Sequence, residues 1–208
     1  EIAANPHFSD DAPGGIRIVD TNNDGSLTPE DRVALGTPYP DFTWGITNTF
    51  QIKDFDISFL IQGVQGITVL NGDVYYNETK KWNKKYTKNR WVSAEHPGDG
   101  KTPYQNVKTG HDLMLTDYPL QNASYACLRN FTVGYTLPAT AARKIKLSGV
   151  RFYVSGSNLF YIWGSGYKGI NPESRMTSGD YSSAMISGYQ RGGFPLTSTI
   201  SAGFDINF

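Results

Sequence analysis

The stretch TSTISAGFDINF, residues 197–208, alternates apolar and polar side chains with a period of two. Successive side chains of a β-strand point to opposite faces, so this period predicts a strand with two unlike faces. The apolar face carries Ile200, Ala202, Phe204, Ile206 and Phe208, and the polar face carries Thr199, Ser201, Gly203, Asp205 and Asn207. A chain with this pattern must either bury one face of its sheet or place it in an apolar medium.

Four other segments alternate in the same way. Their apolar residues are Phe42, Trp44 and Ile46; Phe55, Ile57, Phe59 and Ile61; Phe131, Val133, Tyr135 and Leu137; and Val150, Phe152 and Val154. The composition agrees, because the chain is 13% aromatic and contains 22 glycines, and such chains favour strands and turns over helices. The sequence therefore predicts an all-β fold with about five antiparallel strands.

The connections between these segments are lopsided. Residues 51–53 and 138–148 form short links, whereas residues of about 64–122 and 161–196 form long ones. Short and long links alternate, so every long loop falls at the same end of the sheet. Transmembrane β-barrels have this form, with short periplasmic turns and long extracellular loops. A soluble β-sandwich alternates in the same way, however, and is the commoner class.

Five strands cannot close a barrel, since the smallest barrels have about eight. An isolated sheet of this kind would have two unpaired edges and an uncovered apolar face. We therefore expect the 208 residues to be the C-terminal part of something larger. The chain begins at Glu1 without a methionine or an apolar leader, which fits a mature product, a proteolytic fragment or a split-gene product.

Charge and motif content exclude several functions. Lys plus Arg and Asp plus Glu both number 19, so nothing predicts the basic face that nucleic-acid binding needs. Gly164–Gly169 fits the G-x-G-x-x-G pattern, but Asn171-Pro172 follows it where a dinucleotide site needs a helix. The three histidines lie far apart and lack metal-ligand spacing. No catalytic set emerges, and we expect a protein that is not an enzyme.

Residues 20–31, DTNNDGSLTPED, have the spacing of a calcium-binding loop. An EF-hand loop supplies oxygen ligands from positions 1, 3, 5, 7, 9 and 12, with glycine at position 6 for the sharp turn. Those ligand positions hold Asp20, Asn22, Asp24, Ser26 (through its carbonyl), Thr28 (through a water molecule) and Asp31, and Gly25 is the glycine. The sequence predicts a structural calcium ion that braces a long loop. The alternative is an Asx-rich turn that holds no metal.

Aromatic residues in the long loops admit two interpretations. They could form a surface on which sugars stack, or they could belong to the interfacial aromatic belt and to loop packing. Packing is the commoner role for any single residue. Trp82 and Trp91 lie farthest from the strands and are our candidates for substrate contact.

Several segments, in order, resemble the SusC/RagA-type TonB-dependent outer-membrane transporters. These are DTNNDGSLTPED with Gly36-Thr37-Pro38, NRW at 89–91, NASYACLRNFTVGYTLP at 122–138, VRFYVSGSNLF at 150–160, NPE at 171–173 and GFP at 193–195. The resemblance runs from about Gly15 to Phe208. Cys127 departs from it, since that family usually has Leu or Arg there.

The resemblance implies a barrel of about 22 strands, of which these would be the last five. Residues 1–40 would then be an extracellular loop region, and residues 41–208 barrel strands with long loops. The plug domain and the TonB box would be absent from this chain. Phe204, Ile206 and Phe208 would form the C-terminal assembly signal.

The implied function is nutrient import across the outer membrane of a Gram-negative bacterium of the Bacteroidetes type. The implied partners are the rest of the barrel, outer-membrane lipid, the TonB complex and a SusD-like lipoprotein lid, with a glycan or peptide as substrate. The alternative is a secreted, calcium-stabilised β-module that binds glycans without transport. A soluble module would bury Phe204, Ile206 and Phe208, whereas a barrel segment would expose them to lipid.

Overall fold

The computed structural model describes residues 2–74, 89–104, 115–174 and 188–208. Its elements in chain order are η1 (Ile2–Ala4), η2 (Pro29–Asp31), β1 (Phe42–Ile52), β2 (Phe55–Gln65), β3 (Thr68–Asn71), α1 (Gly72–Val74), β4 (Leu120–Asn122), β5 (Tyr125–Thr136), α3 (Ala139–Lys144), β6 (Gly149–Trp163), β7 (Tyr189–Gln190) and β8 (Thr199–Asn207). Two compact units result, and each is described by itself. The sheet unit comprises Pro40–Ile67, Ala123–Pro172 and Phe194–Phe208; the loop unit comprises Glu1–Tyr39, Thr68–Asn122 and Glu173–Gly193.

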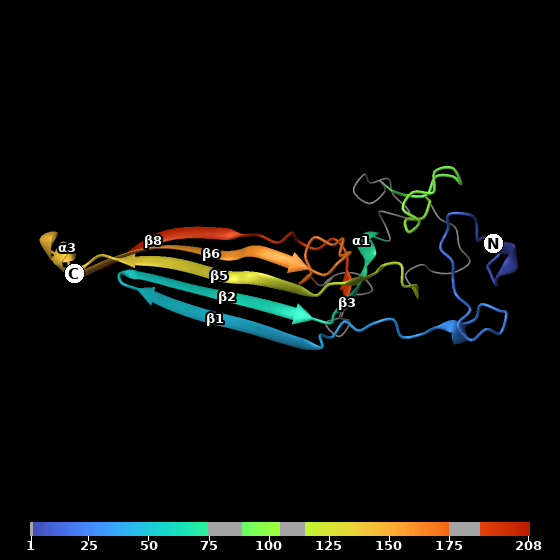
Figure 1. The fold of residues 1–208 in the computed structure, drawn as a ribbon, viewed down its shortest axis with the longest axis horizontal. Coiled ribbons are helices and arrows are strands. Elements are labelled where there is room, and N and C mark those ends of the chain that lie inside the picture. The colour runs from blue at the N-terminus through green and yellow to red at the C-terminus, as the bar shows by residue number, and fades with distance from the viewer. Residues whose placement is uncertain (1, 75–88, 105–114, 175–187) are drawn as a thin grey trace. The chain divides into compact units, whose positions relative to one another are not determined.

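The sheet unit is built on five strands in the order β1-β2-β5-β6-β8, and every neighbouring pair is antiparallel. Figure 1 shows these strands side by side, with β1 and β8 at the two edges. The all-β fold with five antiparallel strands is therefore confirmed. Each strand lies beside its predecessor in the sheet, which makes the sheet a simple meander.

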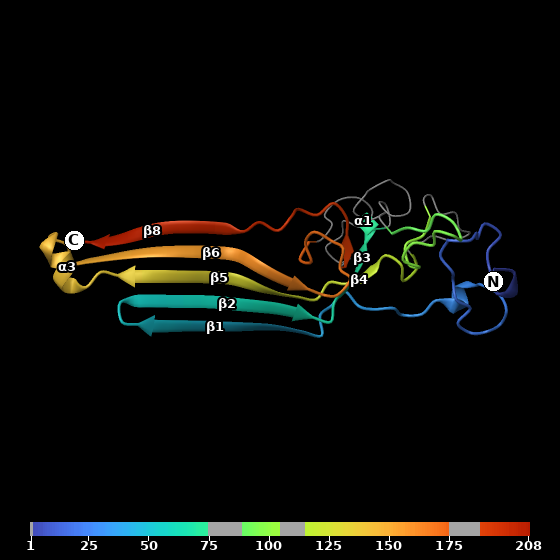
Figure 2. The ribbon, with the colours of Figure 1, turned by 45° about the horizontal axis from the view of Figure 1, so that its top comes forward.

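The short connections lie at one end of the sheet. Lys53 and Asp54 turn β1 into β2, and Lys53 has a φ of +54°. The helix α3, which follows Pro138, joins β5 to β6. At the other end the chain leaves β2 after Gln65 and β6 after Trp163 into long segments (Figure 2). The alternation of short and long links expected from the sequence is present.

One face of the sheet is apolar and exposed. Phe55, Tyr135, Phe152 and Phe204 form a row across four neighbouring strands, each residue paired with the next. The rings of Phe55 and Tyr135 have centroids 4.8 Å apart. Phe204 is 64% exposed and Ile200 is 74% exposed, so in the described residues nothing covers this face. Cross-strand aromatic pairs stabilise the sheet but leave a large apolar surface that water disfavours.

A bulge in β5 keeps the apolar face and the polar face of the sheet continuous along this strand. Arg129 has no partner in the register, because Leu128 pairs with Ile61 and Asn130 pairs with Leu60. The register shifts at this residue: odd positions after it and even positions before it pair with the odd-numbered residues of β2, which lie on the apolar face. One extra residue at a bulge restores the phase. The strand therefore begins at Tyr125, earlier than the simple alternation from Phe131 indicates.

The loop unit contains a three-stranded sheet in the order β4-β3-β7. Its centre is polar. Asn71, which is 1% exposed, donates from Nδ2 to Oε1 of Gln121 at 2.9 Å and accepts from the backbone N–H of Asp73 at 3.0 Å. Val69 and Tyr189 are buried beside it. Among the described residues, no helix is both long enough and apolar enough to cross a membrane.

Candidate functional site

The loop from Asp20 to Asp31 folds on its own side chains. Asp20 accepts hydrogen bonds from the backbone N–H groups of Asp24 (3.3 Å) and Gly25 (2.8 Å), and Asn22 Oδ1 accepts from Asp24 N–H at 2.9 Å. Asp24 Oδ1 accepts from Ser26 N–H at 2.8 Å. Gly25 has a φ of +84°, a conformation that glycine adopts without steric cost. The loop therefore has the sharp turn that the spacing predicted.

Asp31 closes this loop and is buried. Its Oδ1 accepts from Thr21 N–H and its Oδ2 accepts from Thr28 N–H, both at 2.8 Å. Thr28 in turn caps η2 by accepting from Glu30 N–H. The Thr28 N–H, aided by the amides of Thr21 and Asn22, holds the pKa of the Asp31 carboxyl below its usual range. These bonds favour the charged form of the carboxylate.

The oxygen donors of the loop suit calcium in kind: three carboxylates, an amide and a main-chain carbonyl, all hard ligands. In this conformation, however, no three His, Cys, Asp or Glu side chains of the described residues gather into a group that could hold a metal ion. Asp31 is occupied with backbone amides instead. The chemistry of the donor set fits the ion, and whether the loop binds it stays a prediction.

The polar face of the sheet carries two side-chain networks. In the first, Arg151 on β6 donates to both oxygens of Asp56 on β2, at 3.0 and 2.7 Å, and to Asp205 on β8 at 3.3 Å. Its guanidinium also lies 5.2 Å from the centre of the Tyr153 ring. Each of the three charged residues alternates with the apolar residues of its strand, which puts them on one face, but the alternation does not show that they meet. The network lies near the end of the sheet where the short turns are.

The second network surrounds the bulge. Arg129 donates to Gln62 Oε1 at 3.1 Å, to Asn158 Oδ1 at 2.8 Å and to the Tyr161 hydroxyl at 3.0 Å. These partners come from β2 and β6, so Arg129 ties three strands together. Sequence reasoning missed this residue, because the four residues before it, Tyr125 to Leu128, are all apolar and show no alternation.

Of the two tryptophans proposed to contact substrate, only Trp91 lies in the described part of the chain. Trp82 lies outside the described residues. Trp91 is half-buried in the loop unit, where its ring meets that of Tyr104 edge-on, with centroids 6.3 Å apart. A Cβ on Gly14 would overlap the Trp91 ring, so only glycine lets this ring lie against the loop. Nothing in the structure tests a role of either tryptophan in binding.

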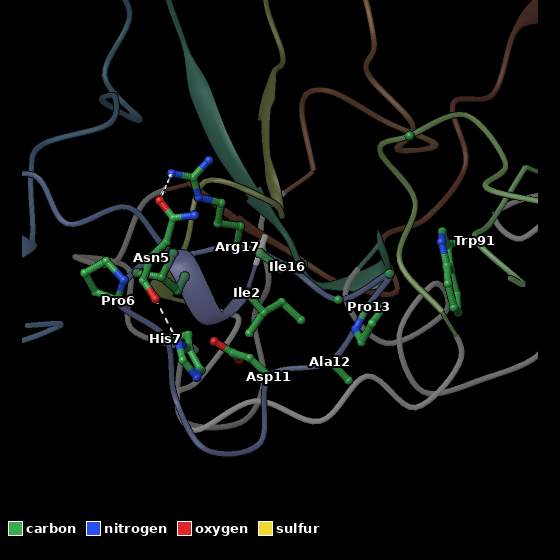
Figure 3. Close-up of a pocket in the computed structure, with 14 residues that line it drawn as sticks. Ile2, Asn5, Pro6, His7, Asp11, Ala12, Pro13, Ile16, Arg17 and Trp91 are labelled. Carbon is green, nitrogen blue, oxygen red and sulfur yellow. Dashed lines mark hydrogen bonds between the residues drawn. The ribbon is translucent and has the colours of Figure 1, made fainter. Parts of the chain in front are cut away.

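Trp91 borders a hollow of about 700 Å³ in the loop unit, which we call the N-terminal hollow. Figure 3 shows the residues around it, which come from the first 18 positions together with Trp91 and Gly100. Arg17 donates to Asn5 Oδ1 at 3.4 Å, and His7 contacts the Asn5 carbonyl at 2.8 Å. The volume lies in the range of small-molecule sites. No motif or spacing in the sequence predicts this hollow.

Sequence comparison relates nearly the whole chain to known proteins. TonB-dependent receptor P3 of Formosa agariphila is 30% identical over 207 residues, which cover 96% of this chain and 19% of the receptor. The chain is a homologue of the TonB-dependent receptors. Receptor P26 of the same organism is 28% identical, and SusC of Bacteroides thetaiotaomicron is 26% identical over 92% of this chain. The resemblance to the SusC type is confirmed.

Solved structures show the same fold. The chain matches part of the RagAB peptide transporter with a TM-score of 0.65 and 20% identity, covering 83% of this chain. It matches the "closed-closed" state of the RagAB peptide importer with a TM-score of 0.67 and 18% identity, covering 95%. No family model matches the chain. The chain spans about a fifth of the length of these SusC-type relatives and structures.

Proposed function

We propose that this chain forms barrel wall and outer loops of a TonB-dependent transporter that imports nutrients across the outer membrane. The observation that carries the proposal is the two-faced sheet. One face is apolar and exposed around Phe152 and Phe204, and the other holds hydrogen-bonded polar networks around Arg129 and Arg151. A barrel wall needs this division, because lipid lies on one side and a polar lumen on the other. The relatives, all named TonB-dependent receptors, support it.

Adjacent residues of β6 provide the test. Val154 points to the apolar face and is 53% exposed, whereas Ser155 points to the polar face. A lysine on the lipid side of a barrel costs about 2–4 kcal/mol near the bilayer midplane, and lumen positions tolerate polar substitution. We expect Val154→Lys to reduce the amount of folded protein in the outer-membrane fraction, and Ser155→Lys to leave it near the wild-type level. Equal recovery of both variants would contradict a lipid-facing apolar surface.

The partners and substrate extend the same proposal. A SusD-like lipoprotein would close over the long outer loops, the TonB complex would supply energy, and the substrate would be a glycan or a peptide. The support is kinship with SusC and with the RagAB peptide transporter. Copurification of the detergent-extracted protein with a surface lipoprotein tests the first point. Growth of a deletion strain on glycans or peptides as sole nutrient tests the substrate class, and dependence of uptake on the proton gradient tests coupling.

We also propose that the loop from Asp20 to Asp31 holds a structural calcium ion. Asp20, Asn22, Asp24, the Ser26 carbonyl and Asp31 would hold the ion, which would fix the loop without taking part in transport. Support comes from the donor spacing and from the turn at Gly25. A calcium titration monitored by calorimetry tests this proposal, with wild type compared with Asp24→Asn. A titration that shows no calcium-dependent heat up to millimolar concentration would sink the idea.

We propose that Phe204, Ile206 and Phe208 act in barrel assembly. Phe204 and Ile206 point to the apolar face of β8, and Phe208 follows that strand and is 94% exposed. Replacement of Phe208 by Asn should slow insertion more than the same change at Phe194, a loop residue that is 88% exposed. The exposure of these side chains does not favour the alternative of a soluble glycan-binding module, which would need to bury them.

A further inference from the structure

Basic side chains gather at the end of the five-stranded sheet where the short links lie. The links 53–54 and 137–148 contain four of the 19 basic residues of the chain but only one of its 19 acidic residues, Asp54. The Thr136 N–H donates to the Asp54 carbonyl at 2.8 Å, which ties the two links together. We call the four basic residues, all of them exposed, the basic rim: Lys53, Arg143, Lys144 and Lys146.

Two lysines of the basic rim have a left-handed backbone conformation. Lys53 has a φ of +54° and Lys146 a φ of +61°, and the other two non-glycine residues with positive φ in the described part of the chain are asparagines. Asparagine is a residue type enriched in that conformation, and lysine is not. Residues held there cost stability, and they cluster at functional sites.

Both lysines stand where glycine is the usual residue. Lys53 is the first residue of a two-residue hairpin turn. Lys146 follows α3 in a Schellman ending, in which its N–H donates to the Arg143 carbonyl at 3.0 Å and the Leu147 N–H donates to the Ala142 carbonyl at 3.1 Å. Glycine would form either turn at less cost. The positions of the two lysines therefore indicate that their side chains serve something other than the turns.

The basic rim adjoins the exposed apolar face of the sheet. Ile52 and Phe55 flank the β1–β2 turn as a cross-strand pair and are 57% and 48% exposed. Ile145, which lies between two basic residues of the rim, is 58% exposed. Figures 1 and 2 show α3 and the β1–β2 turn at the same end of the five strands. Positive charges thus follow the end of the apolar face across several strands.

This arrangement selects among anionic partners. Long basic side chains place their apolar stems along an apolar surface and their charged ends in the polar layer beyond it. An anionic protein or glycan would account for the charges but not for the apolar side chains beside them. A membrane leaflet accounts for both, because acyl chains and anionic headgroups lie side by side and extend along the whole edge.

We propose that the basic rim binds the anionic headgroups of phospholipids in the periplasmic leaflet of the outer membrane. The ammonium and guanidinium groups of the rim donate to phosphate oxygens, in hydrogen bonds that charge strengthens. Ile52 and Ile145 contact the adjoining acyl chains. The inference rests on the proposed function as barrel wall, and it adds the class of lipid that the wall recognises and the leaflet that supplies it.

The test uses the native protein, purified in detergent, and a phosphatidylglycerol probe with a photoreactive diazirine in one acyl chain. Mass spectrometry of peptides then measures covalent labelling of the β1–β2 turn and of residues 139–148. Unlabelled short-chain phosphatidylglycerol should suppress this labelling several-fold better than phosphatidylcholine with the same acyl chains, because only the former has a net negative charge. Inorganic phosphate should not suppress it, since phosphate has no acyl chain.

Paired variants separate the charge from the backbone conformation. Lys53→Gly with Lys146→Gly should weaken competition by phosphatidylglycerol roughly twenty- to thirtyfold, since each basic side chain near an anionic lipid surface contributes about a fivefold factor. This variant should melt no lower than wild type, because glycine adopts positive φ without steric cost. Lys53→Arg with Lys146→Arg should bind as wild type does.

The matched control removes two exposed charges from the loop unit, by Arg32→Gln with Lys101→Gln, and should leave the labelling unchanged. Three results would overturn the inference: phosphatidylcholine competes equally, inorganic phosphate competes, or the glycine variant is labelled as wild type is. A protein that copurifies with wild type but not with the glycine variant, with lipid labelling unaltered, would assign the rim to a protein partner instead.

Membrane fractionation distinguishes this failure from failure of the proposed function. If the protein lies in the outer membrane and Val154→Lys fails to accumulate there, the barrel wall stands whatever the lipid competition shows. Equal labelling of wild type and the glycine variant would then remove only the lipid site. If wild type is absent from the outer-membrane fraction, the proposed function fails first.

Discussion

Arg151 on β6 reaches over the whole width of β5 to form a two-pronged ion pair with Asp56 on β2, at 3.0 and 2.7 Å. The intervening residue is Gly134, which pairs with Asp56 on one side and Tyr153 on the other. With Asp205 added, the network joins β2, β6 and β8 above β5. A single guanidinium thus links strands that are not adjacent in the sheet, which backbone hydrogen bonds alone cannot do.

The Arg151–Asp56 pair should contribute modestly to stability. Its side chains are 31% and 33% exposed, so solvent screens the pair, but the geometry is bidentate. A double-mutant cycle with Arg151→Gln and Asp56→Asn, read from urea unfolding of the purified protein, should give a coupling of about 0.5–1 kcal/mol. The same cycle with Asp205→Asn should give less, because that side chain is 57% exposed and its contact is 3.3 Å. A larger coupling to Asp205 than to Asp56 would contradict Asp56 as the main partner of Arg151.

Gly134 should be intolerant of any side chain. A Cβ there would overlap Asp56 Oδ1 and the Arg151 guanidinium, so Gly134→Ala must displace the ion pair. Gly45 in β1 is the matched control, since a Cβ there would make only ordinary contacts at 3.8 Å with Ile61 and Leu60. We expect Gly134→Ala to lower the unfolding midpoint by an amount worth about 1–3 kcal/mol, and Gly45→Ala to leave it nearly unchanged. Equal midpoints for the two variants would argue against the steric account.

The loop closed by Asp31 should loosen in acid. Its hydrogen bonds, chiefly from Thr28 N–H, lower the carboxyl pKa in the folded state below the ordinary value of 3.8. The stabilisation is therefore complete well above pH 3.8 and is lost as the pH falls through the lowered folded pKa. Hydrogen exchange, corrected for intrinsic rates, should show protection of the Thr21 and Thr28 amides disappearing in that acid range.

Asp31→Asn should remove this pH dependence. Asp10→Asn, a change to an exposed carboxylate outside the loop, should retain it. Protection of the Thr21 and Thr28 amides that does not change with falling pH in wild type, or an unchanged acid profile in Asp31→Asn, would rule out Asp31 as the titrating group.

The polar centre of the loop unit should be costly to disturb. Asn71 is 1% exposed and donates to Gln121, so Asn71→Ala removes a buried donor and leaves room for a void. We expect a loss of about 1–3 kcal/mol, seen as faster hydrogen exchange in β3 and β4. Asn48→Ala, at an exposed position of β1, is the control and should not raise exchange there. A loss no greater than that of the control would mean that the Asn71–Gln121 bond contributes nothing net.

Period-two alternation alone predicted the five strands of the larger sheet, apart from the start of β5. It fixed which residues of β1, β2, β6 and β8 point to the apolar face, because the pleat of a strand forces neighbours to opposite sides. The lengths of the links between these strands predicted that the long loops lie at one end of the sheet. The motifs between Gly15 and Phe208 predicted the relationship to SusC-type receptors. These are local properties, readable from one segment at a time.

Only the tertiary structure decided which side chains from distant parts of the sequence contact each other. The start of β5 at Tyr125 depends on the bulge at Arg129, whose partners Gln62 and Tyr161 lie 67 and 32 residues away in the chain. The ion pair of Arg151 with Asp56 spans 95 residues, and the hollow at Asp11 needs Trp91 folded back beside Gly14. Register and long-range packing set these contacts, and a linear pattern contains neither.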